Sequence, residues 1–184
     1  MKEHPIIFSG ESVRAILDGR KTQTRRVVKP QPTEMGYGAP LWSKGDHSIG
    51  GKIELAKWCP YGQPGDRLWV RETWTDEYGD LCYRADGEIS AGKGDGPGWS
   101  AGWKSPFHMR REDSRITLEI VNVRVERLQE ISEADTLAEG VYPPDNPKDW
   151  KANFGVFWNT INAKRAPWAT NPWVWVLEFK RGPF

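Results

Sequence analysis

Gly19-Arg20-Lys21-Thr22-Gln23-Thr24-Arg25-Arg26 is the stretch on which the interpretation of this chain depends. Four of its eight side chains are cationic, and two threonines and a glutamine accompany them. The stretch lies between an apolar helical pattern and a strand-like segment. So many polar groups between apolar segments fit a site better than a core, although a solvated basic turn followed by an ordinary strand is the competing interpretation.

The residues before this stretch predict a short helix. Ser9 is placed to cap it, because its side-chain oxygen can accept from the first free backbone N–H groups. Apolar residues recur at helical spacing over Val13–Leu17. Gly19 stands where a glycine in the left-handed conformation ends a helix. Lys21 is therefore expected directly after a helix C-terminus.

Residues 22–28 are rich in Thr and Val and predict a strand. In a regular strand, Lys21 and Thr24 would point to opposite faces. A joint role for the two residues therefore requires irregular backbone over 19–22, with the strand beginning only near Thr24. Thr24 and Arg26 then share a face.

Three further segments predict strands, namely Arg67–Trp74, Arg115–Leu128 and Pro172–Phe179. In the longest, the apolar residues change face near Ile120-Val121, which predicts a β-bulge or a barrel corner. The last is apolar on both faces and reads as a closing strand. Ile6-Ile7-Phe8 is typical of a short buried strand.

Two helical patterns follow the longest strand. Ser132 opens the first, with Asp135 as its capping-box partner and Gly140 at its end. Over 150–161, aromatic and aliphatic residues recur at helical spacing, which predicts an amphipathic helix docked on the core. Short strands, one long bulged strand and two or three helices together predict an α+β fold built around a small mixed β-barrel.

Length and composition limit the possible classes of protein. A chain of 184 residues suits one domain, and its net charge of +1 argues against a bulk electrostatic nucleic-acid binder but allows a local basic patch. No apolar run is long enough for a membrane span, and the N-terminus lacks a signal-peptide pattern. Cys59 and Cys82 suit reduced thiols in a cytoplasmic protein. His4, His47 and His108 show no metal-ligand spacing, so we expect no metal site.

Glu139 is the candidate partner for the polar stretch. It occupies the last turn of its predicted helix, where the helix dipole disfavours a carboxylate by about 0.3–1 kcal/mol. Pairing with Lys21 or Arg26 would explain that position. Simple solvent exposure of Glu139, where the cost is screened, is the alternative.

The residues described so far resemble the ASCH domain family, which has a PUA-like barrel fold. Gly19, Lys21 and Arg26 match the family's GxKxxxxR signature, and three more segments are similar to the larger ASCH proteins common in prophages and phages: 64–72, 131–140 and 171–176. The resemblance covers most of the chain and implies a single ASCH/PUA-like domain over 1–184. Insertions at about 33–63 and 86–114 distinguish it from the compact members.

The two insertions also have local character of their own. Residues 33–52 carry several glycines and mixed polarity, which indicates irregular structure. Residues 86–104 are rich in glycine and predict a flexible loop, with a lid over a site as one interpretation. Trp99 and Trp103 within this loop suit either stacking on a base or anchoring the loop.

The resemblance implies two activities. One branch of small bacterial ASCH proteins hydrolyses the amide of N(4)-acetylcytidine to cytidine and acetate, using a Lys, a Thr and a Glu. Carried over to this sequence, these catalytic residues are Lys21, Thr24 and Glu139. The other activity linked to the family is that of a ribonuclease.

The amidohydrolase chemistry is reasonable for these side chains. Thr24 would be the nucleophile, activated by Lys21 if burial or nearby cations lower the lysine pKa. Glu139 would orient Lys21, and Arg26 is a candidate for stabilising the oxyanion. Arg71 and Glu72 are further candidate substrate-binding residues, although they could pair with each other instead. The reaction needs no metal or cofactor.

Three functions therefore remain open from the sequence. The first is an amidohydrolase acting on an N(4)-acylated cytidine nucleoside. The second is a module that binds RNA or a modified nucleotide without chemistry, and the third is a ribonuclease. All three expect a nucleoside or RNA as the ligand.

Overall fold

The computed structural model of the chain has an α+β fold, as the sequence predicts. It describes residues 1–34, 40–44, 47–76, 80–87, 102–141 and 149–182. Within these ranges the α-helices are α1 (Gly10–Leu17), α2 (Lys52–Ala56), α3 (Glu133–Ala138) and α4 (Trp150–Asn162). The prediction of a flexible lid over 86–104 concerns mainly residues 88–101, which lie outside the described ranges.

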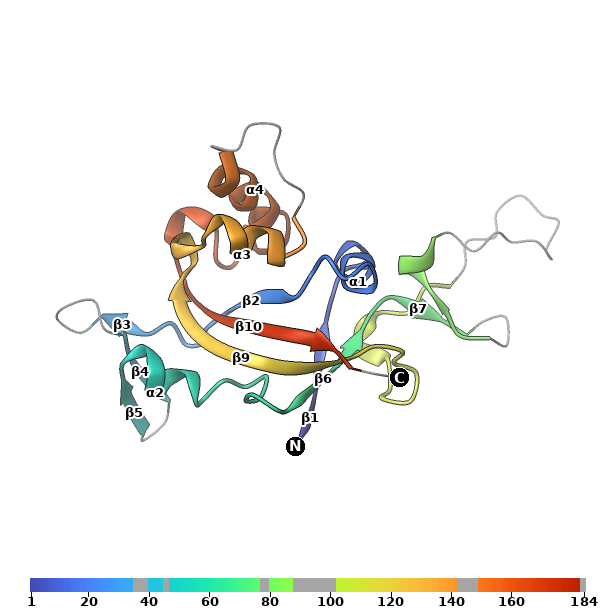
Figure 1. Cartoon of the computed structure of the whole chain (residues 1–184), viewed down its shortest axis with the longest axis horizontal. Helices are drawn as coiled ribbons and strands as arrows, with labels where there is room; N and C mark the ends of the chain where they lie inside the picture. Colours follow the sequence, from blue (N-terminus) through green and yellow to red (C-terminus); the bar gives the residue numbers. More distant parts are fainter. Residues whose placement is uncertain (35–39, 45–46, 77–79, 88–101, 142–148, 183–184) are drawn as a thin grey trace.

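A five-stranded mixed sheet forms the centre of the molecule. Its strands, in spatial order, are β1 (Glu3–Ile7), β6 (Arg67–Arg71), β9 (Thr117–Arg127), β10 (Trp173–Arg181) and β2 (Gln23–Val27). β1 and β6 run parallel, and the other neighbouring pairs are antiparallel. The sheet bends strongly along β9 and β10 (Figure 1).

Among the described strands, the sheet is curled but open, and it does not close into the expected barrel. Its edge strands are β1 and β2. A side chain joins these two edges, because the guanidinium of Arg26 in β2 donates to the carbonyl of Ile7 in β1 at 2.6 Å. The predicted bulge is confirmed. Glu178 pairs with Asn122 and Phe179 pairs with Ile120, which leaves one residue of β9 without an opposite partner. Such a residue bends its strand.

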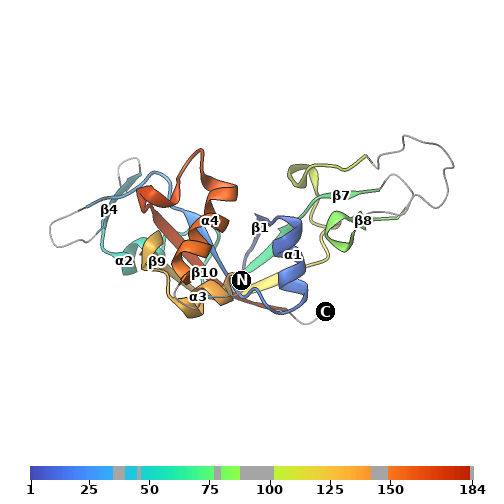
Figure 2. The same cartoon turned by 90° about the horizontal axis from the view of Figure 1, so that it is seen from above.

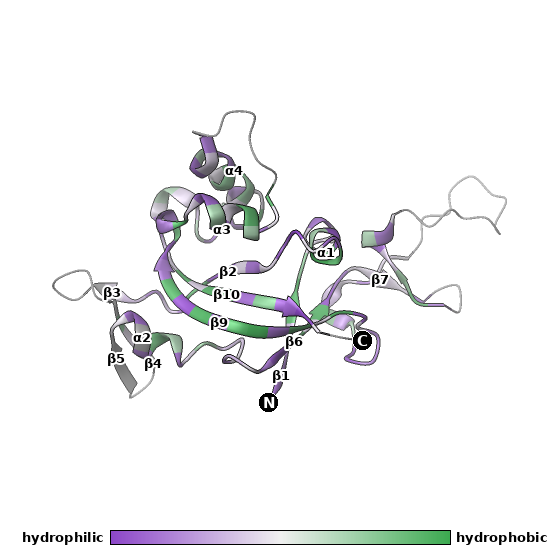
Figure 3. Ribbon diagram, viewed as in Figure 1, coloured by the Kyte–Doolittle hydropathy of each residue, from purple (hydrophilic) through white to green (hydrophobic). Residues whose placement is uncertain are grey.

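The interior strand β10, which lies between β9 and β2, is covered on both faces. Trp173, Trp175 and Leu177 belong to the larger apolar cluster, whereas Val174 and Val176 belong to a second cluster that also contains side chains of α4. This alternation explains why the segment is apolar on both faces, and in Figure 3 green stretches are interrupted by purple ones along β9 and β10. The prediction of a strand that is apolar on both faces is confirmed, although this strand does not close a barrel.

Three helices stand on one side of the curved sheet, where β2 lies (Figure 1). α1 and α4 are neighbours in the view from above (Figure 2), and α3 packs against α4. Ser9 caps α1, and Ser132 with Asp135 forms the predicted capping box of α3. The junctions at the C-terminal ends of α1 and α3 bring the candidate site together.

The prediction of irregular structure over 33–52 is wrong for the described part of that segment. It forms a three-stranded sheet of β3 (Thr33–Glu34), β4 (Pro40–Lys44) and β5 (His47–Gly50), followed by α2. Trp42 and Leu55 are buried in the main apolar cluster. The strands are too short to carry a clear alternation, so the pattern of local hydrophobicity did not reveal them.

The predicted strand over Arg67–Trp74 is divided. β6 ends at Arg71, and β7 (Trp74–Thr75) pairs instead with β8 (Cys82–Tyr83) in a separate two-stranded sheet.

Cys59 and Cys82 are both free thiols, and burial raises the pKa of Cys59 to about 12.

Candidate functional site

Lys21 lies in irregular backbone between α1 and β2, as a role shared with Thr24 requires. Gly19 has φ 73°, and the N–H groups of Arg20 and Lys21 both donate to Ala15 O, at 2.8 and 2.9 Å. β2 begins only at Gln23. The expectation that Lys21 lies outside the regular strand is therefore confirmed.

Lys21 and Glu139 face each other across the ends of two helices. The two residues form an isolated antiparallel bridge, and Thr22 N donates to Ala138 O at 2.8 Å. Gly140 has φ 78°, and a Cβ there would lie 3.0 Å from the Cβ atoms of Ala15 and Lys21. The tight approach of the two helix ends thus depends on the absence of a side chain at position 140.

The Lys21 ammonium is buried and bound to Glu139. Its Nζ donates to Glu139 Oε2 and to Glu139 O, both at 2.8 Å, and each residue is 4% exposed. Burial lowers the pKa of Lys21, the Glu139 carboxylate opposes that effect, and the Arg26 and Arg25 charges add to it. The net direction is downward, which is the direction that a general base at neutral pH needs.

Thr24 lies beside this ion pair on the cavity-facing side of β2. It is 4% exposed, and it pairs with Leu177 in the β2–β10 ladder. Its hydroxyl makes no hydrogen bond within the described part of the chain. Arg26, two residues further along the strand, lines the same cavity, as the alternation of a strand predicts.

One cavity of about 210 Å³ contains all of these groups. Its polar lining comes from Lys21, Thr24, Arg25, Arg26 and Glu139, and its apolar lining includes Phe8, Phe154, Phe157, Trp158 and Ile161. Of the predicted apolar stripe of α4, Phe154 and Trp158 are buried, whereas Ile161 is 62% exposed at the cavity. Phe154 and Trp158 therefore belong both to an apolar cluster of the core and to the cavity lining.

Arg26 is held by the edge strand β1. Besides its bond to Ile7 O, its guanidinium lies over the Phe8 ring at 5.0 Å from the centroid. Its Nε has no hydrogen-bond partner in the described residues. Arg26 thus brings a buried donor to the cavity without pairing directly with Glu139.

Arg71 and Glu72 are not brought to this cavity. The Glu72 carboxylate pairs with Arg115, through Oε1 to Nε at 3.0 Å and Oε2 to Nη2 at 3.1 Å. Arg71 lies over the ring of Trp69 at 4.7 Å from the centroid. The two side chains therefore pair neither with each other nor with Lys21 or Thr24, and a substrate-binding role for them stays a prediction.

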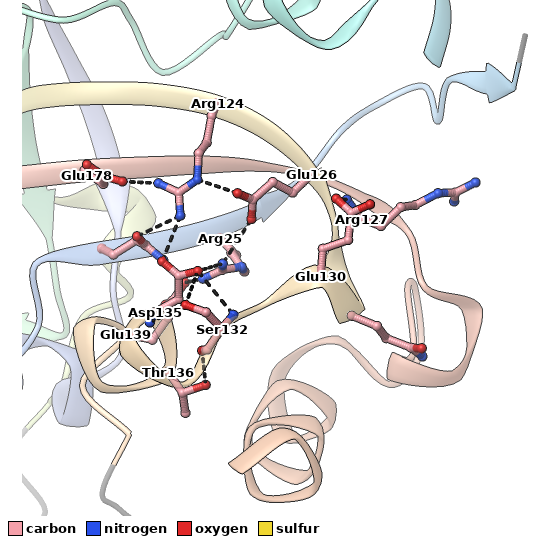
Figure 4. Close-up of polar contacts among 12 residues, drawn as sticks. Arg25, Arg124, Glu126, Arg127, Glu130, Ser132, Asp135, Thr136, Glu139 and Glu178 are labelled. Carbon is pink, nitrogen blue, oxygen red and sulfur yellow. Dashed lines mark hydrogen bonds and ion pairs between the residues drawn. The ribbon is translucent and has the colours of Figure 1, made fainter. Parts of the chain in front are cut away.

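Arg25 is expected from the sequence only as one of the cations near Lys21, together with Arg20 and Arg26, and its carboxylate partners are seen only in the structure. Its Nη1 donates to Glu139 Oε1 at 3.2 Å, and its Nη2 lies 3.2 Å from both Glu126 Oε2 and Asp135 Oδ2. Arg124 joins the same network through Glu126, Asp135 and Glu178 (Figure 4). Alternation along the strand places Arg25 opposite to Thr24, but no sequence signal identifies the carboxylates that it meets.

A larger hollow of about 540 Å³ adjoins the first. It lies between α1 and α4. Ser12, Glu139 and Phe157 line both this hollow and the smaller cavity. Its α1 side carries both signs of charge, from Glu11, Asp18, Arg14 and Arg20. Glu139 thus stands where an inner cavity meets an outer groove.

Within the described residues, no group of three or more His, Cys, Asp or Glu side chains is arranged to hold a metal ion. In the same ranges, no helix has the length and apolar character that crossing a bilayer demands.

Comparison with known proteins adds a single distant match. No family model and no curated protein matches the chain. One solved structure is similar, that of protein EF3133 from Enterococcus faecalis, which is described under the family model DUF984. The TM-score is 0.47 at 8% sequence identity, over 98% of this chain and 80% of that chain. So distant a match assigns neither family nor activity, and the ASCH resemblance stays a prediction.

Proposed function

We propose that this protein is an amidohydrolase that removes the acyl group from an N(4)-acylated cytidine nucleoside. The observation that carries the proposal is the meeting of Lys21, Thr24 and Glu139 in one cavity, each 4% exposed, although they come from two segments far apart in the chain. A buried lysine with a lowered pKa beside an unbonded hydroxyl is an arrangement for activating a nucleophile.

The proposed reaction has two steps. Thr24 Oγ1 attacks the amide carbonyl carbon while its proton passes to the neutral amine of Lys21, and the resulting oxyanion is stabilised by Arg26. The C–N bond then breaks, and Lys21 returns the proton to the leaving amino group of cytidine. Water then attacks the acyl carbon while its proton passes to Lys21, the bond from that carbon to Thr24 Oγ1 breaks, and Lys21 returns the proton to Oγ1, which releases the carboxylic acid and restores Thr24.

The size of the cavity bears on which part of the ligand it receives. A volume of about 210 Å³ is below the roughly 300–1,000 Å³ of sites that enclose a drug-sized ligand. It suits the acylated base, whose faces would meet Phe8, Phe157 and Trp158. The sugar would then extend toward the adjoining groove.

The test is hydrolysis of N(4)-acetylcytidine, followed by chromatography of cytidine and acetate. Lys21→Met keeps the length of the side chain but removes the base, and we expect it to lower the rate roughly 10²–10⁴-fold. Lys57→Met is the matched control, because Lys57 is exposed and pairs only with Glu54 in the described residues. No cytidine from the wild-type protein, or equal rates in wild type and Lys21→Met, would reject the proposal.

A non-catalytic module that binds a modified nucleotide or RNA is the second candidate. The aromatic rings and cations around the cavity favour it, because both kinds of group bind bases in other contexts. It predicts salt-dependent affinity for RNA that Lys21 and Arg26 variants lose, with no product formed. The same incubations with short RNA and DNA oligonucleotides test the ribonuclease alternative, which predicts cleavage of RNA alone.

A further inference from the structure

Arg25 reaches the candidate site from the face of β2 opposite to Thr24. It pairs with Val176 in the ladder, and its side chain is fully buried against the ring of Phe154, 5.9 Å from the centroid. Although Arg25 is among the residues that line the cavity, its side chain has no exposed surface, so its guanidinium is not placed to touch a ligand. Any effect of Arg25 on the site must therefore act through a neighbouring group.

That neighbour is the carboxylate of Glu139, which two cations share. Lys21 Nζ lies 2.8 Å from Oε2, and Arg25 Nη1 lies 3.2 Å from Oε1. Because each oxygen has its own cation, the carboxylate is fixed in one orientation. Its negative charge is also divided, so it stabilises the Lys21 ammonium less than an exclusive partner would.

Arg25 is itself anchored away from the cavity. Its Nη2 lies 3.2 Å from Glu126 Oε2 and 3.2 Å from Asp135 Oδ2. Asp135 is tied to the start of α3 by its bonds with Ser132, and Glu139 is the residue that ends this helix (Figure 4). Arg25 thus links both ends of α3 to β2, in a geometry that does not depend on a bound ligand.

Among the described residues, the charged groups that act on Lys21 are Glu139, Arg26 and Arg25. Glu139 comes from the end of α3, and Arg25 and Arg26 come from β2, whereas α1 and α4 contribute uncharged residues to the cavity. Of these groups, Arg25 alone both contacts the carboxylate and repels the ammonium.

We propose that Arg25 is a positioning residue that sets the protonation equilibrium of Lys21 by dividing the charge of Glu139. The proposal rests on the proposed function for its role in hydrolysis, where it keeps Lys21 able to take the proton of Thr24 near neutral pH. Without Arg25, the whole charge of Glu139 falls to Lys21 and one repelling cation is lost. Both changes stabilise the ammonium.

The experiment is an NMR titration of the Lys21 side-chain amine in wild type, Arg25→Met and Arg25→Lys, with the signal assigned from its loss in Lys21→Arg. We expect the midpoint to rise by about one pH unit in Arg25→Met. The alkaline rise of the rate with N(4)-acetylcytidine should shift by the same amount, so that the rate falls about tenfold at neutral pH and recovers at high pH.

Arg124→Met is the matched control. Arg124 contacts the same Glu126 and Asp135 but not Glu139, so its loss weakens the ionic network without releasing the carboxylate of Glu139. We expect an unchanged Lys21 midpoint. A shift as large as that of Arg25→Met would show that the network as a whole, rather than Arg25, tunes the lysine, and would overturn the proposal.

If Arg25→Met does not fold, the Lys21 titration in Arg25→Lys tests the proposal. A lysine retains the charge but lacks the fork that spans Glu139 and Asp135 at once, so we expect a smaller upward shift. An unchanged midpoint in a folded Arg25 variant overturns the inference. The titration needs no substrate, and an absence of hydrolysis in the wild type therefore rejects the proposed function while leaving the titration to judge Arg25.

Discussion

At the scale of single residues, the site is a small group of buried polar side chains, some of which form ion pairs while Thr24 does not. Lys21, Arg25 and Glu139 are each 4% exposed, and burying charges to this extent is costly unless they are paired. The pairing here is complete for Glu139, whose carboxylate oxygens each meet a cation. Thr24 is different, because its hydroxyl makes no hydrogen bond within the described residues. A hydroxyl in the same cavity as an amine whose pKa is lowered by burial favours a role in chemistry.

Thr24→Val tests that role, since it replaces the hydroxyl with a methyl group of similar size. We expect hydrolysis of N(4)-acetylcytidine to fall at least about a thousandfold, as for other nucleophile deletions, with little change in thermal stability because no hydrogen bond is lost. Thr22→Val is the control, since Thr22 is exposed outside the cavity. A Thr24→Val variant as active as the wild type would assign the attack to water.

At the scale of elements, the site is made by the C-terminal ends of two helices. α1 ends at Leu17 and α3 ends at Ala138, and the residues that follow them form the Lys21–Glu139 bridge. A carboxylate at a helix C-terminus is disfavoured by the dipole. Pairing with Lys21 and Arg25 offsets that effect, whereas the sequence predicted Lys21 or Arg26 as the partner of Glu139.

The carboxyl group of Asp135, at the start of α3, leads to a prediction about how the stability of the fold depends on pH. Burial acts to raise the pKa of the Asp135 carboxyl, but the hydrogen bonds from Ser132 and the charge of Arg25 outweigh it and lower the pKa to about 2. A lowered pKa stabilises the folded state above the unfolded value near 4, and that contribution is lost as the pH falls toward 2. It amounts to about 2 kcal/mol at neutral pH.

We therefore expect Asp135→Asn to lower the free energy of unfolding by about 2 kcal/mol at pH 7 and by much less at pH 2.5, measured by urea denaturation. Glu133→Gln, an exposed acid in the same first turn, should change it by less than about 0.5 kcal/mol at both pH values. A cost of Asp135→Asn that does not fall with pH would contradict the assignment to charge.

At the scale of the whole molecule, the three-stranded sheet is part of the core rather than an addition to it. Trp42 of β4 is 3% exposed in the main apolar cluster, and its Nε1 donates to Pro30 O at 2.9 Å. Leu55 of α2 is fully buried in the same cluster. The segment 33–63 therefore supports the sheet that carries Thr24.

Trp42→Ala should destabilise the whole protein by about 3–5 kcal/mol, because it empties a buried site of an indole. Phe107→Ala is the control, since that ring is 72% exposed and its loss should cost less than about 0.5 kcal/mol. Thermal unfolding followed by circular dichroism measures both. If Trp42→Ala leaves the melting temperature unchanged, the segment folds separately from the main sheet.

The sequence by itself determined the features that depend on neighbours along the chain. Capping at Ser9 and Ser132, the left-handed glycine after α1 and the bulge in β9 all follow from residues within a few positions of one another. The backbone break that separates Lys21 from β2 also follows, because Gly19 ends one element before the next begins.

The tertiary structure alone decided which groups meet across the fold. Alternation in β2 fixes that Arg25 points away from Thr24, but the sequence does not state that Arg25 meets Glu139, Glu126 and Asp135. Likewise, Glu72 meets Arg115 rather than the cavity. Partners of a strand side chain come from distant segments, whose placement depends on packing and not on spacing.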